Sequence, residues 1–404
     1  MSLKKIKVLV ITSSFPRNKD DWWQQAILYF YKYLDKKFKI TVIAPSAPGA
    51  KSSENLFNIE VKRFTYFYPK SLQRLTTGEG ILYSGKRGVL NRIQVLTFVL
   101  SEFVYTFYIM LKRDFDIIHA QWIFPQGLLG VFGKFIFKKP LIVTGHGVDI
   151  FGLKKINIIK KFILNSADIC TVNSRATFDE AKEIAPGANV KIIPPGVDLK
   201  VFNKRNNDED WRKKYGDNPK IILGVGRLIR WKGFEYLIKA LPLVLRKFPD
   251  SKVIIIGSGP EEETLKMLVK KLKIEKKVFF IGHVSTSELS SAYASADVFV
   301  SPSITYSTGE REGLGNVILE ALASGVPVIA SRSGGIVDLI DGRSTGLLFE
   351  EKNIKNIAKK ISFLLSNKME RDNFSKNGLN FVKKNYSWEK IDKDLGDLYE
   401  SILH

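Results

Sequence analysis

Cysteine is nearly absent from this sequence of 404 residues, in which Cys170 is the single example. One cysteine cannot form an intramolecular disulfide, so a disulfide-stapled secreted fold is excluded and a reducing compartment is expected. Cys170 lies in ADICTVNS, a run with the composition of a strand. We therefore interpret it as a small buried side chain rather than as a nucleophile.

Long hydrophobic runs are also lacking. The apolar run within MSLKKIKVLVITSSFP has about six residues, which is short of a signal-peptide core. The longest apolar segment, residues 94–112, is interrupted by Glu102, whereas a membrane-spanning helix needs roughly 20 mostly apolar residues. We expect no secretory signal, and we interpret residues 94–112 as a buried or interfacial helix.

Acidic residues are scarce relative to basic ones, with 41 Asp and Glu against 63 Lys and Arg and a formal net charge of +22. The excess is concentrated in residues 1–200, where 30 basic residues stand against 15 acidic ones, compared with 33 against 26 in residues 201–404. Such charge indicates an anionic partner, namely membrane lipid, a phosphorylated substrate or nucleic acid. A lysine-rich surface that is merely solvated gives the same count, and composition does not separate these alternatives.

Strand-like and helix-like segments alternate along the whole chain. Continuous apolar strands joined by helical patterns are typical of a parallel sheet covered on both faces, and two such series predict two doubly wound α/β domains. The predicted strands are IKVLVIT, KITVIAP, DIIHAQW, PLIVTGHG, ADICTVNS and VKIIPP in the first series, and KIILGVG, KVIIIGSG, KVFFIGH and DVFVSPS in the second. The predicted domains cover 1–200 and 201–385, with the polar run 203–220 as a linker and 386–404 as an amphipathic C-terminal helix.

Ligands of open α/β sheets bind at the carboxyl ends of the strands, and the cleft between two such domains is the first place to expect a site. Arg227 and Lys232 follow the first strand of the second domain, in GVGRLIRWKGFEYL. Their charges suit a diphosphate, and Gly226 lets the backbone approach it. The segment is neither a P-loop nor a GxGxxG fingerprint. A basic turn that caps a helix is the alternative interpretation.

The stretch EREGLGNVILEALASGVPVIAS places Glu312 and Glu320 on either side of a glycine-rich turn. A helix is expected to begin near Asn316 and to end at Gly325, so the free N–H groups of its first turn would face an anion. A carboxylate can accept two hydrogen bonds from a vicinal diol, which suits ribose or a hexose. The helix dipole alone would explain Glu312, but it does not explain Glu320 within an otherwise apolar run.

Two histidines of the first domain lie at neighbouring strand ends, His119 in DIIHAQW and His146 in TGHGVD, with Asp149 close behind. A single histidine is more often a satisfied core residue. Two of them at one sheet edge favour contact of one with substrate. In the second domain the segment IGHVSTSEL is a weaker signal, since the backbone near Val284 would suit the flat edge of a base.

Together these segments resemble the family-four retaining glycosyltransferases, which have the GT-B fold of two Rossmann-like domains facing across a cleft. The resemblance covers nearly the whole chain, and its most specific part is the E-x7-E pattern of Glu312 and Glu320 with Arg227 and Lys232 upstream. The matching segments are TGHGVD, IPPGVD, GVGRLIRWKGFEYLIKAL, VIIIGSGP, VFFIGHVSTSELSSAYASADVFVSPS and EGLGNVILEALASGVPVIAS.

The resemblance implies a role for each matching residue. Arg227 and Lys232 would bind the donor diphosphate. Glu320 would hold the ribose hydroxyls, and Glu312 would contact the transferred sugar. His146 would lie near the reacting sugar.

The resemblance also implies how the leaving nucleotide is neutralised. The backbone amides that would contribute are those of Gly313, Leu314, Gly315 and Asn316. No metal or other cofactor is expected, because the basic pair and the helix dipole take over the work that a divalent ion does elsewhere. The final helix would cross back to the first domain.

The loop after the first strand departs from the family pattern. Many members carry a Gly-Gly pair there, near the phosphates, whereas this loop reads SSFPRNKDDWWQQ and contains no glycine. Arg17 and Lys19 are therefore predicted to act as substitutes. On the acceptor side the candidates are Arg17, His119 and Asp149.

The sequence thus predicts a hexosyltransferase (EC 2.4) that moves a sugar from a nucleoside-diphosphate sugar to a glycan or lipid-linked acceptor, and the family resemblance implies retention of configuration. Assembly of cell-surface polysaccharide, glycolipid or glycoprotein glycan is the expected setting. We expect a cytoplasmic protein in peripheral contact with the anionic inner face of the membrane. This expectation rests on the charge of the first half and on the basic, aromatic segments KKFKI, VKRFTYFYPKSLQR and YIMLKR.

Other functions stay open on the residues alone. A related GT-B enzyme, such as a sugar-nucleotide epimerase or a phosphorylase, would share much of the pattern. Net charge would also suit a nucleic-acid-binding protein, but no RNA-binding sheet motif or zinc finger is visible, and Glu312 and Glu320 would repel a phosphate backbone. We therefore predict no nucleic-acid partner. An NAD-dependent oxidoreductase is disfavoured because the first strand ends in TSSFP without a glycine fingerprint.

Overall fold

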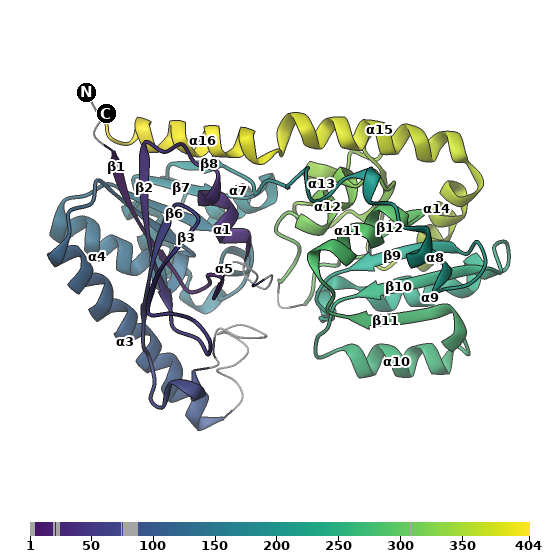
Figure 1. Cartoon of the computed structure of the whole chain (residues 1–404), viewed down its shortest axis with the longest axis horizontal. Helices are drawn as coiled ribbons and strands as arrows, with labels where there is room; N and C mark the ends of the chain where they lie inside the picture. Colours follow the sequence, from purple (N-terminus) through teal and green to yellow (C-terminus); the bar gives the residue numbers. More distant parts are fainter. Residues whose placement is uncertain (1–4, 19–20, 22–24, 74, 76–87, 308) are drawn as a thin grey trace. The chain divides into compact units, whose positions relative to one another are not determined.

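The computed structural model describes residues 5–18, 21, 25–73, 75, 88–307 and 309–404 (Figure 1). Lys19, Trp22, Trp23, Gln24 and Arg74, which belong to segments discussed above, lie outside the described residues. The chain divides into two compact units. The first unit comprises Met1–Asn173, Thr177–Ile193 and Ile391–His404, and the second comprises Ser174–Ala176 and Pro194–Lys390.

The first unit is built on a sheet that, among the described residues, has eight strands in the order β3-β4-β2-β1-β5-β6-β7-β8. Strand β3 pairs antiparallel with β4, and the other neighbours pair in parallel. The strands are β1 (Ile6–Thr12), β2 (Phe38–Pro45), β3 (Ser53–Leu56), β4 (Ile59–Phe64), β5 (Ile117–Gln121), β6 (Leu141–Gly145), β7 (Ile169–Val172) and β8 (Val190–Ile192).

Helices connect and cover these strands. They are α1 (Gln25–Lys32), α3 (Val89–Lys112), α4 (Leu128–Phe137), α5 (Val148–Phe151), α6 (Asn157–Ser166), α7 (Arg175–Ile184) and the C-terminal α16 (Trp388–Ser401). Helix α16 brings Leu395, Leu398 and Tyr399 into the core of the first unit, where the Tyr399 ring meets Phe38 edge-on at 5.5 Å. The last residues of the chain are therefore part of the unit in which the chain begins.

The second unit contains, within the part of the chain that the structure describes, a parallel sheet of six strands in the order β11-β10-β9-β12-β13-β14. Its strands are β9 (Lys220–Val225), β10 (Ser251–Ile256), β11 (Val278–Gly282), β12 (Val298–Ser301), β13 (Val328–Ser331) and β14 (Leu347–Phe349). Its helices are α8 (Glu209–Lys213), α9 (Phe234–Leu245), α10 (Glu262–Lys271), α11 (Thr286–Ser295), α12 (Asn316–Ala323), α13 (Ile336–Leu339), α14 (Ile354–Ser366) and α15 (Lys368–Asn385).

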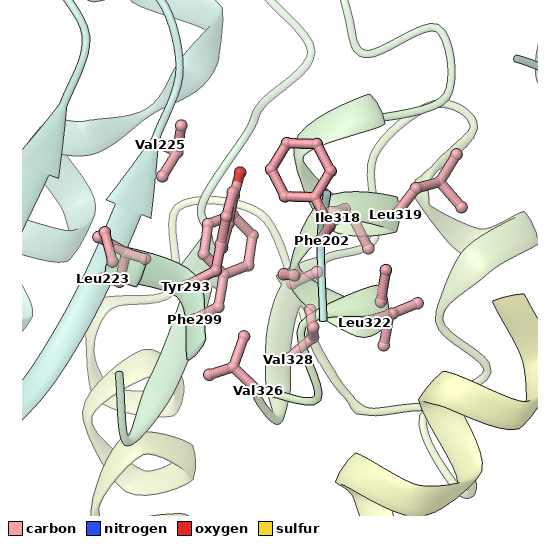
Figure 2. Packing of buried hydrophobic residues seen from close by; sticks show 14 of the residues in the cluster. Phe202, Leu223, Val225, Tyr293, Phe299, Ile318, Leu319, Leu322, Val326 and Val328 are labelled. Carbon is pink, nitrogen blue, oxygen red and sulfur yellow. The ribbon is translucent and has the colours of Figure 1, made fainter. Parts of the chain in front are cut away.

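Alternate side chains of β9 enter two separate hydrophobic cores, one on each face of the sheet. Ile221 and Leu223 belong to one core, and Ile222 belongs to the other. Figure 2 shows the first of these cores, in which the Tyr293 ring lies 5.9 Å from the ring of Phe202 and 5.5 Å from that of Phe299. A strand that is buried on both faces must be apolar at every position, which is why β9 reads as a continuous run.

The predicted strands of both series are confirmed, with ends that differ by a few residues. The helix after Gly315 begins at Asn316 as predicted, and Gly325 follows its last turn with a left-handed φ of 69°. Four strands were not predicted, namely β3, β4, β13 and β14. Helix α3 begins at Val89, before the predicted start, and continues to Lys112.

The prediction of a linker over residues 203–220 is wrong. Trp211 and Tyr215 of this segment are buried in the core of the second unit. Asp208 caps α8 by accepting a hydrogen bond from the Trp211 backbone N–H at 3.0 Å, and Arg212 donates to Asp297 at 3.1 Å. The polar residues of the segment bind the unit's surface while its two aromatic residues anchor it.

Three aromatic residues of two segments expected to reach a membrane are buried, whereas Tyr68 of the second segment is 75% exposed. Phe38 of KKFKI packs on Tyr399, and Phe64 and Tyr66 of VKRFTYFYPKSLQR pack around Phe98 at ring distances of 5.1 and 5.2 Å. These rings complete the core of the first unit and are not available to lipid. The third segment, YIMLKR, ends α3 and has exposed residues.

Candidate functional site

Helix α12 begins at a glycine-rich turn, as the sequence predicts. Gly315 is the N-cap residue with a φ of 102°, and it offers no side-chain oxygen to the first N–H groups of the helix. Leu314 is buried in the core of the second unit, which fixes the turn against the sheet. The first N–H groups of a helix lack intrahelical partners and carry partial positive charge, so this end of α12 suits an anion.

Glu312 and Lys232 form an ion pair next to this turn. Lys232 Nζ lies 2.5 Å from Glu312 Oε2, and only about 15% of each side chain is exposed (15% and 14%). The Ser303 hydroxyl donates to the same carboxylate oxygen at 3.3 Å. Lys232 ends a single 3₁₀ turn, Arg230–Lys232, that follows β9, and Arg227 lies between that strand and the turn. The two residues are 80 positions apart in the sequence, and the parallel sheet brings them together.

Glu320 lies one turn into α12 and accepts a hydrogen bond of 2.9 Å from the Tyr293 hydroxyl of α11. Burial raises the pKa of Glu320 to about 7, while the hydrogen bond from Tyr293 and the charge of Lys232 act in the opposite direction. Burial also raises the pKa of Tyr293 well above its ordinary value, so the phenol is neutral and donates. Lys232 therefore acts on both carboxylates of the E-x7-E pattern.

Two glycines hold the backbone of the Glu312 turn at close range, and the sequence analysis did not identify them. The Gly335 N–H donates to the Glu312 carbonyl oxygen at 3.1 Å. A Cβ on Gly335 would lie 2.0 Å from the Gly313 carbonyl oxygen, and one on Gly334 would lie 2.0 Å from the Glu312 carbonyl oxygen. Glycine is needed at both positions because any side chain would displace the turn that carries Glu312.

Val284 was the weakest of the predicted donor contacts. It lies between β11 and α11, and its half-buried side chain packs against the same core as Tyr293. The helix after it is capped by Ser285, whose hydroxyl accepts from the Glu288 N–H at 3.2 Å. The position of Val284 is thus fixed from both sides.

His146 of the first unit lies between β6 and α5 and is held by three neighbours. Its Nε2 lies 2.6 Å from Gln121 Oε1, and its ring lies 4.6 Å from that of Trp122. Its backbone N–H donates to Asp149 Oδ1 at 2.8 Å. Burial lowers the pKa of His146, so the neutral ring with the proton on Nε2 is favoured.

Asp149 binds backbone rather than facing outward. Its second carboxylate oxygen accepts from the Ile123 N–H at 2.9 Å, and the side chain is buried. It therefore links the turn after β5 to the turn after β6. In this position it orients His146.

His119 is enclosed in the first unit, with only 1% of the residue exposed. Its Nδ1 lies 2.6 Å from the Tyr399 hydroxyl and 3.1 Å from that of Tyr31, and its Nε2 lies 2.6 Å from Thr144 Oγ1. Burial lowers its pKa to about 3, so the ring is neutral. These contacts make His119 a hydrogen-bonded core residue that ties α16 to the sheet.

Arg17 is engaged by the acid four residues later. Its Nε and Nη2 donate to the two carboxylate oxygens of Asp21 at 2.7 and 3.1 Å, and its backbone N–H donates to Asp21 Oδ2 at 2.9 Å. The pair raises the pKa of Arg17, and about two fifths of the Arg17 side chain is exposed (41%). The guanidinium therefore keeps open surface beside a buried carboxylate.

The structure brings together some of the predicted residues within each unit. Lys232, Glu312, Glu320 and the start of α12 form one cluster, and His146 and Asp149 form another. Sequence reasoning missed Tyr293 and Gln121, which hold Glu320 and His146. Gln121 is the last residue of β5. It could have been found by the same rule that located His119, namely that ligands bind at the carboxyl ends of the strands. No group of three or more His, Cys, Asp or Glu suited to a metal ion occurs among the described residues.

Comparison with protein families gives matches to both halves of the chain. The profile of the family "Glycosyltransferase Family 4" matches residues 24–201, and that of "Glycosyl transferases group 1" matches residues 207–381. Among characterised relatives, the GDP-mannose-dependent alpha-(1-6)-phosphatidylinositol monomannoside mannosyltransferase of Mycolicibacterium smegmatis is 32% identical over 68% of this chain and 73% of its own length. The N-acetyl-alpha-D-glucosaminyl L-malate synthase of Bacillus anthracis is 27% identical over 72% of this chain and 76% of its own.

Solved structures share the whole fold. The sucrose-phosphate synthase of Thermosynechococcus elongatus superimposes with a TM-score of 0.80 at 21% identity, covering 98% of this chain and 99% of its own. The HepE protein of Anabaena, solved with UDP and glucose, gives a TM-score of 0.73 at 20% identity, covering 98% and 100%. At this level of identity the likeness establishes the GT-B fold, with its two Rossmann-like α/β units.

Proposed function

The chain belongs to the glycosyl transferases group 1 family and is a nucleotide-sugar glycosyltransferase, and from that premise we propose that it moves a hexose to a glycan or lipid-linked acceptor with retention of the anomeric configuration. The observation that carries this proposal is the pairing of Lys232 with Glu312, beside Glu320 and the open start of α12. This cluster offers cations and N–H groups to a diphosphate and carboxylates to sugar hydroxyls.

Lys232, Arg227 and the amides of Gly313, Leu314, Gly315 and Asn316 would receive the diphosphate. Negative charge builds on the phosphate oxygen as its bond to the sugar breaks, and donors already in place stabilise that charge without reorganisation. Lys232 is held in position by Glu312 before any ligand arrives. With these groups the reaction needs no metal ion in our proposal.

Glu320 would accept hydrogen bonds from the two ribose hydroxyls of the donor. Its partly buried carboxylate already accepts one hydrogen bond from Tyr293, which leaves the other oxygen for the ligand. Burial raises the pKa of this group to about 7, so two further hydrogen-bond donors from ribose would stabilise its charged form. Donor binding is then coupled to loss of a proton near neutral pH.

Glu312 would contact the transferred hexose, and His146 would lie near its reacting carbon. In a retaining transfer the bond from the anomeric carbon to the phosphate oxygen breaks, and the acceptor oxygen bonds to the same face. The acceptor's proton passes to the departing phosphate oxygen. Gln121 and Asp149 orient the His146 ring, and the ring is neutral. It would therefore offer the sugar a polar contact without a positive charge.

GDP-mannose is the donor that we propose to test first. Three relatives at 32–35% identity are named as GDP-mannose-dependent mannosyltransferases that act on phosphatidylinositol monomannosides. Their names support a lipid-linked acceptor for this chain. The residues that would read the base lie near Val284.

A panel of UDP-, GDP-, ADP- and dTDP-sugars, measured by thermal shift on the wild type, Glu320→Ala and Glu263→Ala, tests the donor site. Glu263 is an exposed acid on α10 of the same unit and serves as the matched control. A ligand at 100 times its Kd should add about 2.7 kcal/mol to the free energy of unfolding. We expect one nucleotide class to stabilise the wild type and Glu263→Ala but not Glu320→Ala. Equal stabilisation of all three proteins would refute the assigned site, and NMR of the product's anomeric carbon would test retention.

A further inference from the structure

The outward side of α3 is apolar along its length. Its exposed side chains recur every three or four residues, which places them in one stripe. Leu96, Leu100 and Val104 are 67, 65 and 66% exposed, and Ile93, Tyr108 and Leu111 extend the stripe in both directions. A helix on the surface of a protein in water normally carries charged residues at such positions.

The polarity of α3 is inverted, because its charged residue points inward. Glu102 is the single charged residue between Ile93 and Leu111, and it is fully buried. The Gln126 amide donates to both of its carboxylate oxygens, at 3.0 and 2.9 Å. Placing the acid inside and the leucines outside costs stability in water, which indicates that the outer side of α3 is covered by something apolar.

Two neighbouring helices extend this apolar surface. Phe132 of α4 meets Phe103 of α3 edge-on at 5.9 Å, and the exposed residues Phe135 and Ile136 follow it. Lys134 of α4 donates a hydrogen bond of 2.9 Å to the Ser166 carbonyl oxygen of α6. On α6 the exposed apolar residues are Ile158, Ile159 and Phe162. We call the outer side of these three helices the α3/α4/α6 face. Figure 1 shows α3 and α4 side by side on the first unit.

Exposed basic residues border the α3/α4/α6 face. They are Arg92 and Lys112 at the ends of α3, Lys138 after α4, and Lys154, Lys155 and Lys161 at α6. Two acids that follow α3 and α6 in the chain are engaged by other lysines, since Asp114 pairs with Lys139 at 2.8 Å and Asp168 with Lys134 at 2.7 Å. The surface therefore combines apolar side chains with unmatched positive charge.

Helix α3 is long and apolar enough to cross a membrane by length and composition, and about a third of its most apolar window (33%) is buried inside the protein. Its buried side includes Gln94, Glu102 and Thr106, which face the first unit. A helix fixed along a folded unit in this way presents one side to its surroundings. It is suited to lie in the plane of a bilayer rather than to span it.

We propose that the α3/α4/α6 face docks on the surface of an anionic membrane, with the apolar side chains of the three helices in the headgroup and acyl boundary and the bordering lysines on lipid phosphates. Charge complementarity favours lipid over a second copy of this basic chain, whose equal surface would repel it. The inference deepens the proposed function, since it names the surface that would bring the enzyme to a lipid-linked acceptor. It differs from the sequence-based expectation, which relied partly on rings that are buried.

Flotation of the full-length protein with phosphatidylcholine vesicles, with and without a third of phosphatidylglycerol, tests the proposal without donor or acceptor. The variant Leu96→Gln, Leu100→Gln, Val104→Gln replaces exposed residues with good helix formers. The control Met267→Gln, Val337→Gln, Met369→Gln changes three exposed apolar residues of the second unit. We expect the wild type and the control to float with anionic vesicles, and the α3 variant to bind at least about tenfold more weakly.

The lysines provide a second, independent variant. Lys154→Gln, Lys155→Gln, Lys161→Gln should weaken binding to anionic vesicles and flatten its dependence on salt, whereas Lys270→Gln, Lys271→Gln, Lys276→Gln in the second unit should not. Failure of the wild type to float, or equal flotation of the α3 variant, would overturn the proposal. So would a wild-type dimer in solution that the α3 variant makes monomeric, because a second copy would then cover the face. Vesicle binding without sugar transfer would instead count against the proposed function alone.

Discussion

The hydroxyl of Tyr293 donates a hydrogen bond of 2.9 Å to Glu320, joining α11 to the second acid of the E-x7-E pattern. This hydrogen bond lowers the pKa of Glu320, in opposition to burial, which raises it to about 7. The position of one phenol therefore tunes the charge of the carboxylate that is proposed to hold the donor ribose.

Removing this hydroxyl should shift donor binding to higher pH. In Tyr293→Phe the pKa of Glu320 rises, so a larger fraction of the protein carries a neutral carboxyl at pH 7 and the donor Kd increases there. The difference from the wild type should shrink at pH 9, where both carboxyls are charged. Isothermal titration across this range measures it. Tyr215→Phe, in the same hydrophobic core, is the control, and a pH-independent loss of affinity would contradict the assignment.

Glu320→Gln should change how stability depends on pH. The pKa of Glu320 is about 7 in the folded chain against an ordinary value of 4.5, so between these values the folded state binds more protons than the unfolded state. The free energy of unfolding contributed by this group therefore falls as the pH rises through that window. The variant lacks this loss and should gain on the wild type by up to about 3 kcal/mol between pH 4.5 and 7.5. Thermal melts of the wild type and the variant across this pH range measure the difference, and Glu263→Gln is the control. If the Glu320 carboxyl titrated at its ordinary pKa, the variant would show no gain over the wild type as the pH rises.

Lys232→Gln should reduce kcat/KM by about 10²- to 10³-fold, because a charge-stabilising group near the leaving diphosphate is lost and Glu312 loses its cation. The half-buried pair of Lys239 with Glu235, at 2.6 Å on α9, offers a matched control in Lys239→Gln. Steady-state kinetics with the donor found by thermal shift gives the comparison. Similar activities of the two variants would remove Lys232 from the site.

Gly335→Ala should destabilise the second unit by about 1–3 kcal/mol, since the new Cβ would lie 2.0 Å from the Gly313 carbonyl oxygen and force the Glu312 turn to move. Donor affinity should fall with it. Gly187→Ala is the control, because the nearest atom to its Cβ is 3.6 Å away. Chemical denaturation and donor titration measure the two effects. Full donor affinity in Gly335→Ala would mean that the turn does not carry the site.

Gln121→Glu should raise the pKa of His146, because a carboxylate 2.6 Å from Nε2 favours the charged ring, whereas burial now lowers that pKa. In a plot of the transfer rate against pH, the acidic limb should therefore move to higher pH. NMR titration of the histidine rings measures the shift, and His283 of the second unit is an internal reference. A shift in His283 as large as that in His146 would point to a general perturbation.

Most strands were predicted because a parallel strand buried on both faces is apolar along most of its length, as in β1 and β9. Strands β3 and β4 were missed because SENL and IEVKRF mix charged and apolar residues at the edge of the sheet. The false linker at 203–220 has mostly polar residues, and its anchors Trp211 and Tyr215 are a small minority of the segment.

The part of the site that could be predicted is the part whose residues lie close together in the sequence. Glu312 and Glu320 lie on one turn and its helix, so their separation is read directly from the sequence. The partners Tyr293 and Gly335 come from other elements, and only the folded sheet brings them to Glu320 and Glu312. His119 shows the opposite case, since its place at a strand end suggested exposure, but α16 covers it through Tyr399.

That cover has a consequence for biosynthesis. Tyr399 is translated 280 residues after His119, the residue to which it bonds, and the whole second unit is made in between. A ribosome-bound chain therefore carries a first unit whose His119 and Phe38 lack Tyr399 until α16 has been synthesised. Synthesis of α16, rather than of the first half of the chain, is the step that lets the first unit close its core, and a truncation that removes Tyr399 would leave His119 and Phe38 without this partner.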